Sequence, residues 1–285
     1  MQFIWALRGA IGFAVLWFAL AATAAEPMRV ATLVPAVNPG FEADPARYEI
    51  VATVRRSMHA PPLVGQQDLG SPHAPSIELL VASQPDLVVG DASMHARLAT
   101  QLEPLGLNVA LVDTRTSDSL LAGLEQIAAQ PPGSERLVEA AGQARRELKA
   151  QHLAKPVAVV AFFGVPGSFY LVSERWWLGE MMQQLGFENL VPDIPNERFP
   201  GLVPVNDERL ALLRPEIVFL VTHGDPGAVS GEFQRMASQD GAWSGLAAPE
   251  LGVHVLDPEL FMATPALNAP NAARELIEIA SGQGP

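Results

Sequence analysis

Two twelve-residue stretches, Glu78-Leu-Leu-Val-Ala-Ser-Gln-Pro-Asp-Leu-Val-Val89 and Glu208-Arg-Leu-Ala-Leu-Leu-Arg-Pro-Glu-Ile-Val-Phe219, share one pattern. In each, a glutamate precedes a proline by seven positions, and an acidic residue follows the proline. Each stretch reads as a helix, a breaking proline and a buried strand. The repetition predicts two similar lobes, each with one surface glutamate at an equivalent place. A cleft between two lobes commonly holds a small ligand, and the matched glutamates suit the docking of a partner protein.

Length, charge and composition limit the kind of protein. The chain has 285 residues, 49% of them hydrophobic, which allows one large or two ordinary globular domains. The net charge of −13 argues against nucleic acid and anionic membrane surfaces as partners, because both attract basic faces. The sequence has no cysteine, which excludes disulfides, thiol catalysis, cysteine-bound zinc and lipid modification at a cysteine.

Residues 1–25 have the features of a signal peptide. Arg8 gives a positive start, residues 9–20 are apolar, and the small residues Ala21–Ala25 offer a cleavage site before Glu26. An uncleaved anchor is the alternative, because an apolar run of about 17 residues is at the lower limit for crossing a membrane. Removing the segment takes the net charge from −13 to −14. We expect a soluble protein of the Gram-negative periplasm.

The rest of the chain alternates predicted strands and helices. Predicted strands cover Met28–Val34, Tyr48–Val54, Leu87–Val89, Asn108–Val112, Pro156–Phe163, Ile217–Val221 and Val253–Leu256. Predicted helices cover Ser76–Ser83, Ala92–Leu102, Asp118–Ala129, Trp176–Leu185, Asp207–Leu213, Gly231–Gln239 and Asn271–Ala280. Strands that alternate with helices indicate parallel βαβ units. We therefore expect an α/β fold with two lobes, each with a mostly parallel sheet flanked by helices.

One long helix is predicted to join the two lobes. Ser134 is a suitable N-cap, and the helix runs to about His152, which makes it about 28 Å long at 1.5 Å per residue. Leu137, Ala144 and Leu148 mark its apolar face. The predicted division is a signal peptide at 1–25, an N-terminal lobe at 26–133, a connecting helix at 134–154 and a C-terminal lobe at 155–285.

This order of elements resembles the periplasmic substrate-binding proteins of ABC importers. Within them it is similar to the group with one long connecting helix, which carries ferric siderophores, haem or cobalamin. The supporting segments are Pro61–Gly65, Ser76–Val89, Leu171–Gly186, Val205–Val221 and Trp243–Pro258. No single segment is diagnostic, but their order and spacing cover nearly all of the chain beyond residue 25. The resemblance implies a monomeric carrier, without a cofactor of its own, that delivers an iron chelate to a membrane permease.

The resemblance also gives the two repeated glutamates a role. In that family one glutamate per lobe meets arginines of the permease, and Glu78 and Glu208 match those residues by position. Paired arginine and carboxylate groups suit such docking because the contact is bidentate and fixes orientation. A single glutamate of this kind is ordinarily a solvated helix residue. The equal offset from the proline in both stretches favours docking.

Candidate ligand-binding residues follow the predicted strands, because ligands of open α/β lobes bind beyond the carboxyl ends of the strands. They are Arg55, Arg56, Met58, His59, Met94, His95, Tyr170, Arg175, Trp176 and His223. Arginines bind carboxylate or catecholate oxygens, and aromatic rings pack on planar surfaces. We therefore expect a ferric siderophore first, haem second and cobalamin third. Of Trp176 and Trp177, one belongs to the core, and the sequence does not say which.

Residues in the loop after Val54 are the reason that haem stays a candidate ligand. In haem-carrying relatives a tyrosine or histidine of this loop is an axial iron ligand. Met58 or His59 stands at about that place, although the usual tyrosine is absent.

Binding of a bare metal ion is a further alternative. His59, His95 and His223 all follow strands, and His73 lies in a nearby loop. Together with a carboxylate such as that of Asp91 or Asp257, three imidazoles bind Zn²⁺ or Mn²⁺. Against this alternative, no two histidines have the helical i, i+4 spacing.

A secreted hydrolase is the competing class of protein. The sequence contains no Gly-x-Ser-x-Gly, His-Glu-x-x-His or Ser-x-x-Lys motif. Gly164-Val-Pro-Gly167 is not a phosphate loop, because no Gly-Lys-Ser/Thr follows. We therefore expect a binding protein and no enzyme. A signalling role, in which the protein presents its ligand to a membrane receptor, stays open beside uptake.

Overall fold

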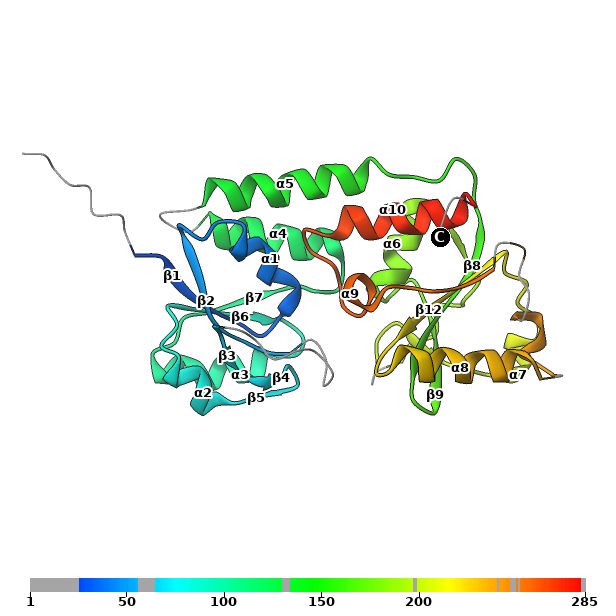
Figure 1. Ribbon diagram of the computed structural model, residues 1–285, viewed down its shortest axis with the longest axis horizontal. Helices are drawn as coiled ribbons and strands as arrows, with labels where there is room; N and C mark the ends of the chain where they lie inside the picture. Colours follow the sequence, from blue (N-terminus) through cyan, green and yellow to red (C-terminus); the bar gives the residue numbers. More distant parts are fainter. Residues whose placement is uncertain are drawn as a thin grey trace, which may run out of the picture.

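The computed structural model has two α/β lobes side by side, spanned along one edge by helices α5 (Glu135–Lys149) and α10 (Ala269–Ala280) (Figure 1). It describes residues 26–55, 65–129, 134–196, 199–239, 241–246, 250 and 252–282. The predicted signal peptide and the candidate residues Arg56, Met58 and His59 lie outside these ranges. No helix within them is long and apolar enough to cross a membrane.

The N-terminal lobe is built on a parallel sheet with the strand order β3-β2-β1-β6-β7. Its strands are β1 (Met28–Thr32), β2 (Tyr48–Thr53), β3 (Gln67–Asp68), β6 (Leu87–Asp91) and β7 (Val109–Val112). Its helices are α1 (Asn38–Glu42), α2 (Ile77–Ala82), α3 (Ala96–Leu102) and α4 (Ser117–Ala128). A small antiparallel hairpin joins β4 (Gly70–Ser71) to β5 (Ala74–Pro75). Every residue of β6 is buried, as expected for an interior strand of a sheet covered on both faces.

The C-terminal lobe has a mixed sheet with the order β11-β9-β8-β12-β13, and β10 also pairs with β8. The strands are β8 (Ala158–Val165), β9 (Ser168–Val172), β10 (Glu188–Asn189), β11 (Leu202–Pro204), β12 (Ile217–Thr222) and β13 (Val253–Val255). The helices that accompany them, besides α10, are α6 (Trp177–Leu185), α7 (Asp207–Leu210), α8 (Pro226–Ala237) and α9 (Pro258–Phe261). The predicted α/β class and the two-lobe arrangement are confirmed.

The hairpin of β8 and β9 differs from the sequence-based prediction, which placed Tyr170 in a loop after the strand Pro156–Phe163. The chain turns at Pro166-Gly167, where Gly167 has φ +80°, and β9 returns antiparallel to β8. Proline followed by a glycine of positive φ is the signature of a tight turn. The side chains of β9 therefore alternate between the two faces of the sheet instead of leaving a strand end.

The repeated stretches form equivalent units in the two lobes. Ser76 and Asn206 each cap a helix by accepting the backbone N–H three residues later. The acidic residue after each proline then bonds the backbone near the start of the neighbouring strand. The carboxylate of Asp86 accepts the N–H of Arg29 at 2.8 Å, and that of Glu216 accepts the N–H of Ala158 at 3.0 Å. The second helix is shorter than predicted, since α7 ends at Leu210.

Helix α5 begins as predicted but ends earlier. The Ser134 hydroxyl accepts the N–H of Leu137 at 3.2 Å and also bonds the buried carboxylate of Asp44. The helix ends at Lys149 rather than near His152, which makes it about 22 Å long. The next residue but one, Gln151, leaves the helix and donates to the carbonyl of Pro270 in α10 at 2.9 Å.

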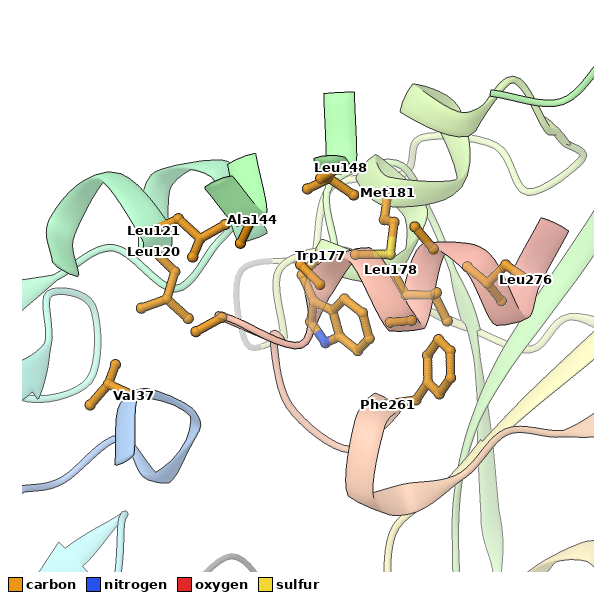
Figure 2. Packing of buried hydrophobic residues seen from close by; sticks show 14 of the residues in the cluster. Val37, Leu120, Leu121, Ala144, Leu148, Trp177, Leu178, Met181, Phe261 and Leu276 are labelled. Atoms are coloured by element: carbon orange, nitrogen blue, oxygen red, sulfur yellow. The ribbon is translucent and has the colours of Figure 1, made fainter. Parts of the chain in front are cut away.

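The hydrophobic core runs from one lobe into the other beneath α5. Leu120 of α4 and Leu148 of α5 belong to the same buried cluster as Trp177, Phe261 and Leu276 of the C-terminal lobe (Figure 2). Burial of this shared surface is favourable in proportion to its apolar area. It fixes the lobes against each other and leaves their strand ends facing across a gap.

Candidate ligand-binding cavity between the lobes

A cavity of about 590 Å³ lies between the lobes, at the carboxyl ends of β1, β6, β8 and β12. This is the position where open α/β sheets bind ligands, and the volume falls within the usual range for small-molecule sites. Most side chains that line the cavity are apolar or aromatic. Of the predicted ligand-binding residues, the cavity brings together Arg55, Met94, His95, Tyr170, Trp176 and His223.

The C-terminal lobe gives the cavity an aromatic wall. The ring of Phe163 lies 5.3 Å from that of Trp176 and 5.9 Å from that of His223, between ring centroids. Tyr170 on β9 meets Phe199 edge to face at 5.9 Å. Aromatic pairs at these separations attract each other and hold a stiff surface. Such a wall suits a flat, largely apolar ligand.

The two neighbouring tryptophans take different roles. Trp177 is only 4% exposed and stacks on Phe261 at 6.2 Å, so it is the core residue, with one edge reaching the cavity. Trp176 is half-buried and stands before the first turn of α6, at the N-cap position. The backbone of Gly201 lies against it: a Cβ at Gly201, where φ is +83°, would come within 2.3 Å of the Trp176 nitrogen. Only glycine allows this approach, which carries Phe199 to the cavity.

The buried polar groups of the N-terminal lobe are already engaged. Asp91 accepts hydrogen bonds from the N–H and hydroxyl of Ser93, the N–H of Met94 and the hydroxyl of Thr114. Burial by itself raises the pKa of Asp91, but these hydrogen bonds together bring the pKa below its ordinary value. The carboxylate is therefore ionised and saturated with donors.

His95 is equally occupied. It is 3% exposed, and its Nδ1 accepts the N–H of Asp91 at 2.8 Å. Because Nδ1 is an acceptor, Nε2 carries the proton and donates to the carbonyl of Pro72 at 2.8 Å. His95 lines the cavity, but both of its ring nitrogens are engaged in hydrogen bonds, which does not favour the alternative in which it binds a metal.

Arg55 is the one cationic side chain that lines the cavity within the described residues. Its Nε is 2.7 Å from a carboxylate oxygen of Asp68, and both side chains are partly exposed. The other predicted arginine of the described chain, Arg175, does not line the cavity and instead pairs with Asp193 at 2.7 Å.

His223 differs from His95, because its side chain is exposed and its ring has no hydrogen bond within the described residues. Partial burial and the neighbouring His73 lower the pKa of His223. The neutral imidazole is therefore favoured, and this is the form that binds metals.

The other candidate metal ligands of the described residues do not assemble into a site. Asp257 caps α9 by accepting the N–H of Glu259 at 2.9 Å. The part of the chain that the structure describes contains no group of three histidine, aspartate or glutamate side chains placed to hold a metal ion. A protein-bound zinc or manganese site built from His95 and His223 is therefore not supported.

The sequence-based prediction missed the segment Pro258–Asn268, which lines the cavity through Leu260, Met262 and Thr264. The Thr264 hydroxyl donates to the carbonyl of Thr114 and so ties the lobes together directly. The signal was available, because this segment follows the last predicted strand, Val253–Leu256, and strand ends mark ligand sites. His73 was noticed only as a nearby loop residue.

Comparison with known proteins agrees with this arrangement. The profile of the family described as "Periplasmic binding protein" matches residues 37–252. The High-affinity heme uptake system protein IsdE of Staphylococcus aureus is 22% identical over 219 residues, which are 74% of this chain and 73% of IsdE.

Solved structures show the same fold. An ABC transporter substrate-binding protein from Listeria monocytogenes has a TM-score of 0.73 at 22% identity, covering 89% of this chain and 98% of that one. S. aureus IsdE complexed with heme has a TM-score of 0.71 at 19% identity, covering 88% and 98%. A periplasmic vitamin B12 binding protein, BtuF of Vibrio cholerae, has a TM-score of 0.68 at 17% identity, covering 90% and 98%. At these identities the likeness is one of fold.

Proposed function

Because the chain belongs to the periplasmic binding protein family, we propose that it is the solute-binding component of an ABC importer and that its cargo is haem. The observation that carries the proposal is His223, whose ring has no hydrogen bond within the described residues and which stands on an aromatic wall in the cavity between the lobes. The nitrogen of such an imidazole is a typical ligand of haem iron. The flat rings of Phe163 and Trp176 suit contact with the face of a porphyrin. The haem-binding relatives support the same choice.

Haem replaces the ferric siderophore that the sequence favoured. That preference depended on several arginines facing the ligand. Among the described residues only Arg55 does so, and Asp68 already neutralises part of its charge. An anionic chelate needs several cationic donors in a desolvated site. The cavity instead offers mainly apolar surface, which favours a porphyrin over a catecholate or hydroxamate complex.

A parallel titration tests the cargo. The purified chain is titrated with hemin, and separately with ferric siderophores and with cobalamin, while absorption and protein fluorescence are recorded. We expect saturable hemin binding with a shifted Soret band, and weaker binding after His223→Ala. His152→Gln is the matched control, because His152 lies outside the cavity and bonds the carbonyl of Leu153. Binding of a ferric siderophore but not of hemin would contradict the proposal.

A ferric siderophore is the second candidate, and Arg55 is the observation that favours it. The Arg55 guanidinium reaches the cavity with donors beyond the Nε that pairs with Asp68. Such donors bind carboxylate or catecholate oxygens. In the same titration, Arg55→Ala should abolish siderophore binding if this candidate is correct.

We also propose that Glu78 and Glu208 dock the protein on the importer's permease. Both glutamates are exposed and occupy the second position of a capped helix, α2 and α7. The two helices lie at the edge of the molecule away from α5, one in each lobe (Figure 1). Two carboxylates held apart by rigid lobes give a partner two anchoring points and a fixed orientation. Residues 1–25 would direct the chain to the periplasm, where the permease offers its docking face.

A further inference from the structure

One buried polar group at the cavity has no hydrogen-bond partner. Among the described residues, three buried side chains hold a nitrogen or oxygen atom without a hydrogen bond: Ser117, Trp177 and Thr222. Of these three, only Trp177 lines the cavity, and it is 4% exposed. The unpaired atom of Trp177 is Nε1, and an indole N–H can only donate. A buried donor without an acceptor is unfavourable, so this one requires an explanation.

The indole of Trp177 is held in place by neighbouring rings. It stacks on Phe261 at 6.2 Å and lies 5.3 Å from the ring of Trp176, between ring centroids. In Figure 2 its nitrogen lies on the side of the ring that faces away from Phe261 and toward Val37 of the N-terminal lobe. Because these contacts hold the ring, the direction of its N–H is fixed, as a pre-formed binding site requires.

The N-terminal lobe offers no acceptor on that side of the cavity. The residues near Val37 that line the cavity have apolar side chains, and they are Pro35, Ala36 and Pro39. The amide of Asn38 does not line the cavity and is hydrogen-bonded to the hydroxyls of Thr32 and Thr53. Since no described group of the protein accepts the N–H of Trp177, its acceptor belongs to the molecule that fills the cavity.

The charge of the surrounding backbone favours an anionic acceptor. Trp176 is the N-cap of α6 and Asn268 is that of α10; both residues line the cavity, and neither side chain caps its helix. The N-terminal end of a helix carries a partial positive charge, which stabilises a nearby anion. Two carboxylates also line the cavity, but Asp91 is saturated with donors and Glu259 is exposed to solvent. A carboxylate therefore suits the donor of Trp177 better than a neutral acceptor.

We propose that the Nε1–H of Trp177 donates a hydrogen bond to a carboxylate of the bound cargo and so fixes the orientation of the cargo in the cavity. The inference rests on the proposed haem cargo, whose strong hydrogen-bond acceptors are its propionate carboxylates. The opposite edge of the porphyrin carries only hydrocarbon groups. A single donor of fixed direction thus distinguishes the two edges. The bond is non-covalent, and no proton or electron is transferred.

Replacing Trp177 by phenylalanine tests the bond, because the change removes the N–H and keeps an aromatic ring. Hemin and its dimethyl ester, which lacks the propionate charges, are titrated separately into the full chain, Trp177→Phe and Trp243→Phe. We expect Trp177→Phe to weaken hemin binding about tenfold or more, since a hydrogen bond to a charged group is lost, and to weaken ester binding much less. Trp243→Phe is the matched control, because Trp243 packs in the core of the C-terminal lobe and does not line the cavity.

Nuclear magnetic resonance observes the N–H directly. The indole signals are assigned from the spectra of Trp176→Phe, Trp177→Phe and Trp243→Phe, and diamagnetic gallium(III) protoporphyrin is the probe. We expect the signal of Trp177 to move downfield on binding and its exchange with solvent to slow. The dimethyl ester of the probe has the same ring current, so a smaller shift with the ester isolates the contribution of the carboxylate.

The outcomes separate the inference from the proposed function. If the parent chain does not bind hemin saturably, the haem proposal falls and the inference falls with it. If hemin binds but Trp177→Phe lowers the affinity for hemin and ester equally, or lowers neither, only the donor role of Trp177 is overturned. If Arg55→Ala, and not Trp177→Phe, removes the preference for hemin over its ester, the carboxylate lies at Arg55 and the inference is likewise overturned.

Discussion

The N-terminal lobe brings a buried aspartate and a buried histidine to the cavity, whereas the C-terminal lobe brings ring faces and an exposed histidine. In the first lobe the polar atoms of Asp91 and His95 are already hydrogen-bonded to neighbouring protein groups. In the second, the hairpin of β8 and β9 adds Tyr170 to a wall that also holds Phe163 and Trp176. This difference shows that residue type alone does not identify a side chain that binds the ligand. What matters is whether the polar atoms are already paired.

The lobes are most alike at α2 and α7, the helices that we propose to dock on the permease, and changing both of them should have the largest effect. We expect the double variant Glu78→Lys/Glu208→Lys to abolish uptake of the cargo, and each single variant to reduce it. Hemin affinity should not change, because neither glutamate lines the cavity. Growth on hemin as the only iron source measures uptake, and titration measures affinity. Glu139→Lys on α5 is the control, since it is exposed on the opposite edge; loss of hemin affinity in the double variant would refute the docking role.

In the C-terminal lobe, substitution of one tryptophan should mainly reduce stability, and substitution of the other should mainly weaken ligand binding. Trp177→Ala removes a ring buried against Phe261 and should lower the free energy of unfolding by about 3–5 kcal/mol. Trp176→Ala should cost less stability and mainly weaken hemin binding, because Trp176 is only half-buried and faces the cavity. Urea unfolding and hemin titration of both variants measure the two effects. Equal losses of stability would argue against the assignment of Trp177 to the core.

Two of the cavity histidines, the buried His95 and the exposed His223, sharpen the contrast between the lobes. His95→Ala leaves the buried N–H of Asp91 without its partner, at about 1–3 kcal/mol, and also removes the partly buried hydrogen bond to the carbonyl of Pro72. His223→Ala breaks no hydrogen bond of its ring within the described residues, so thermal unfolding should change little. Melting temperatures of the apo variants measure this difference. A larger destabilisation by His223→Ala than by His95→Ala would contradict the reading of His95 as a structural residue.

Much of the local structure was predictable because its causes are local. Ser134 caps its helix as expected, the helix predicted to start at Ser76 is capped by that serine, and Gly186 ends α6 in the left-handed conformation with φ +89°. The repeated Glu-to-Pro pattern predicted two helix–strand units, and both are present. The hairpin at Pro166-Gly167 was missed because the βα rhythm of the rest of the chain favoured a loop there, although proline followed by glycine is a turn signal in its own right.

The sequence by itself determined most of the longer helices, the parallel strands at the centre of each sheet, the two-lobe order and the position of the cavity at the strand ends, since periodicity and capping act within a few residues. Only the tertiary structure decided that Trp177 is core while Trp176 faces the cavity, and that Arg175 pairs with Asp193. It also decided that His95 is occupied while His73 and His223 face one space. Those outcomes depend on contacts between residues far apart in the chain, and folding alone brings such residues together.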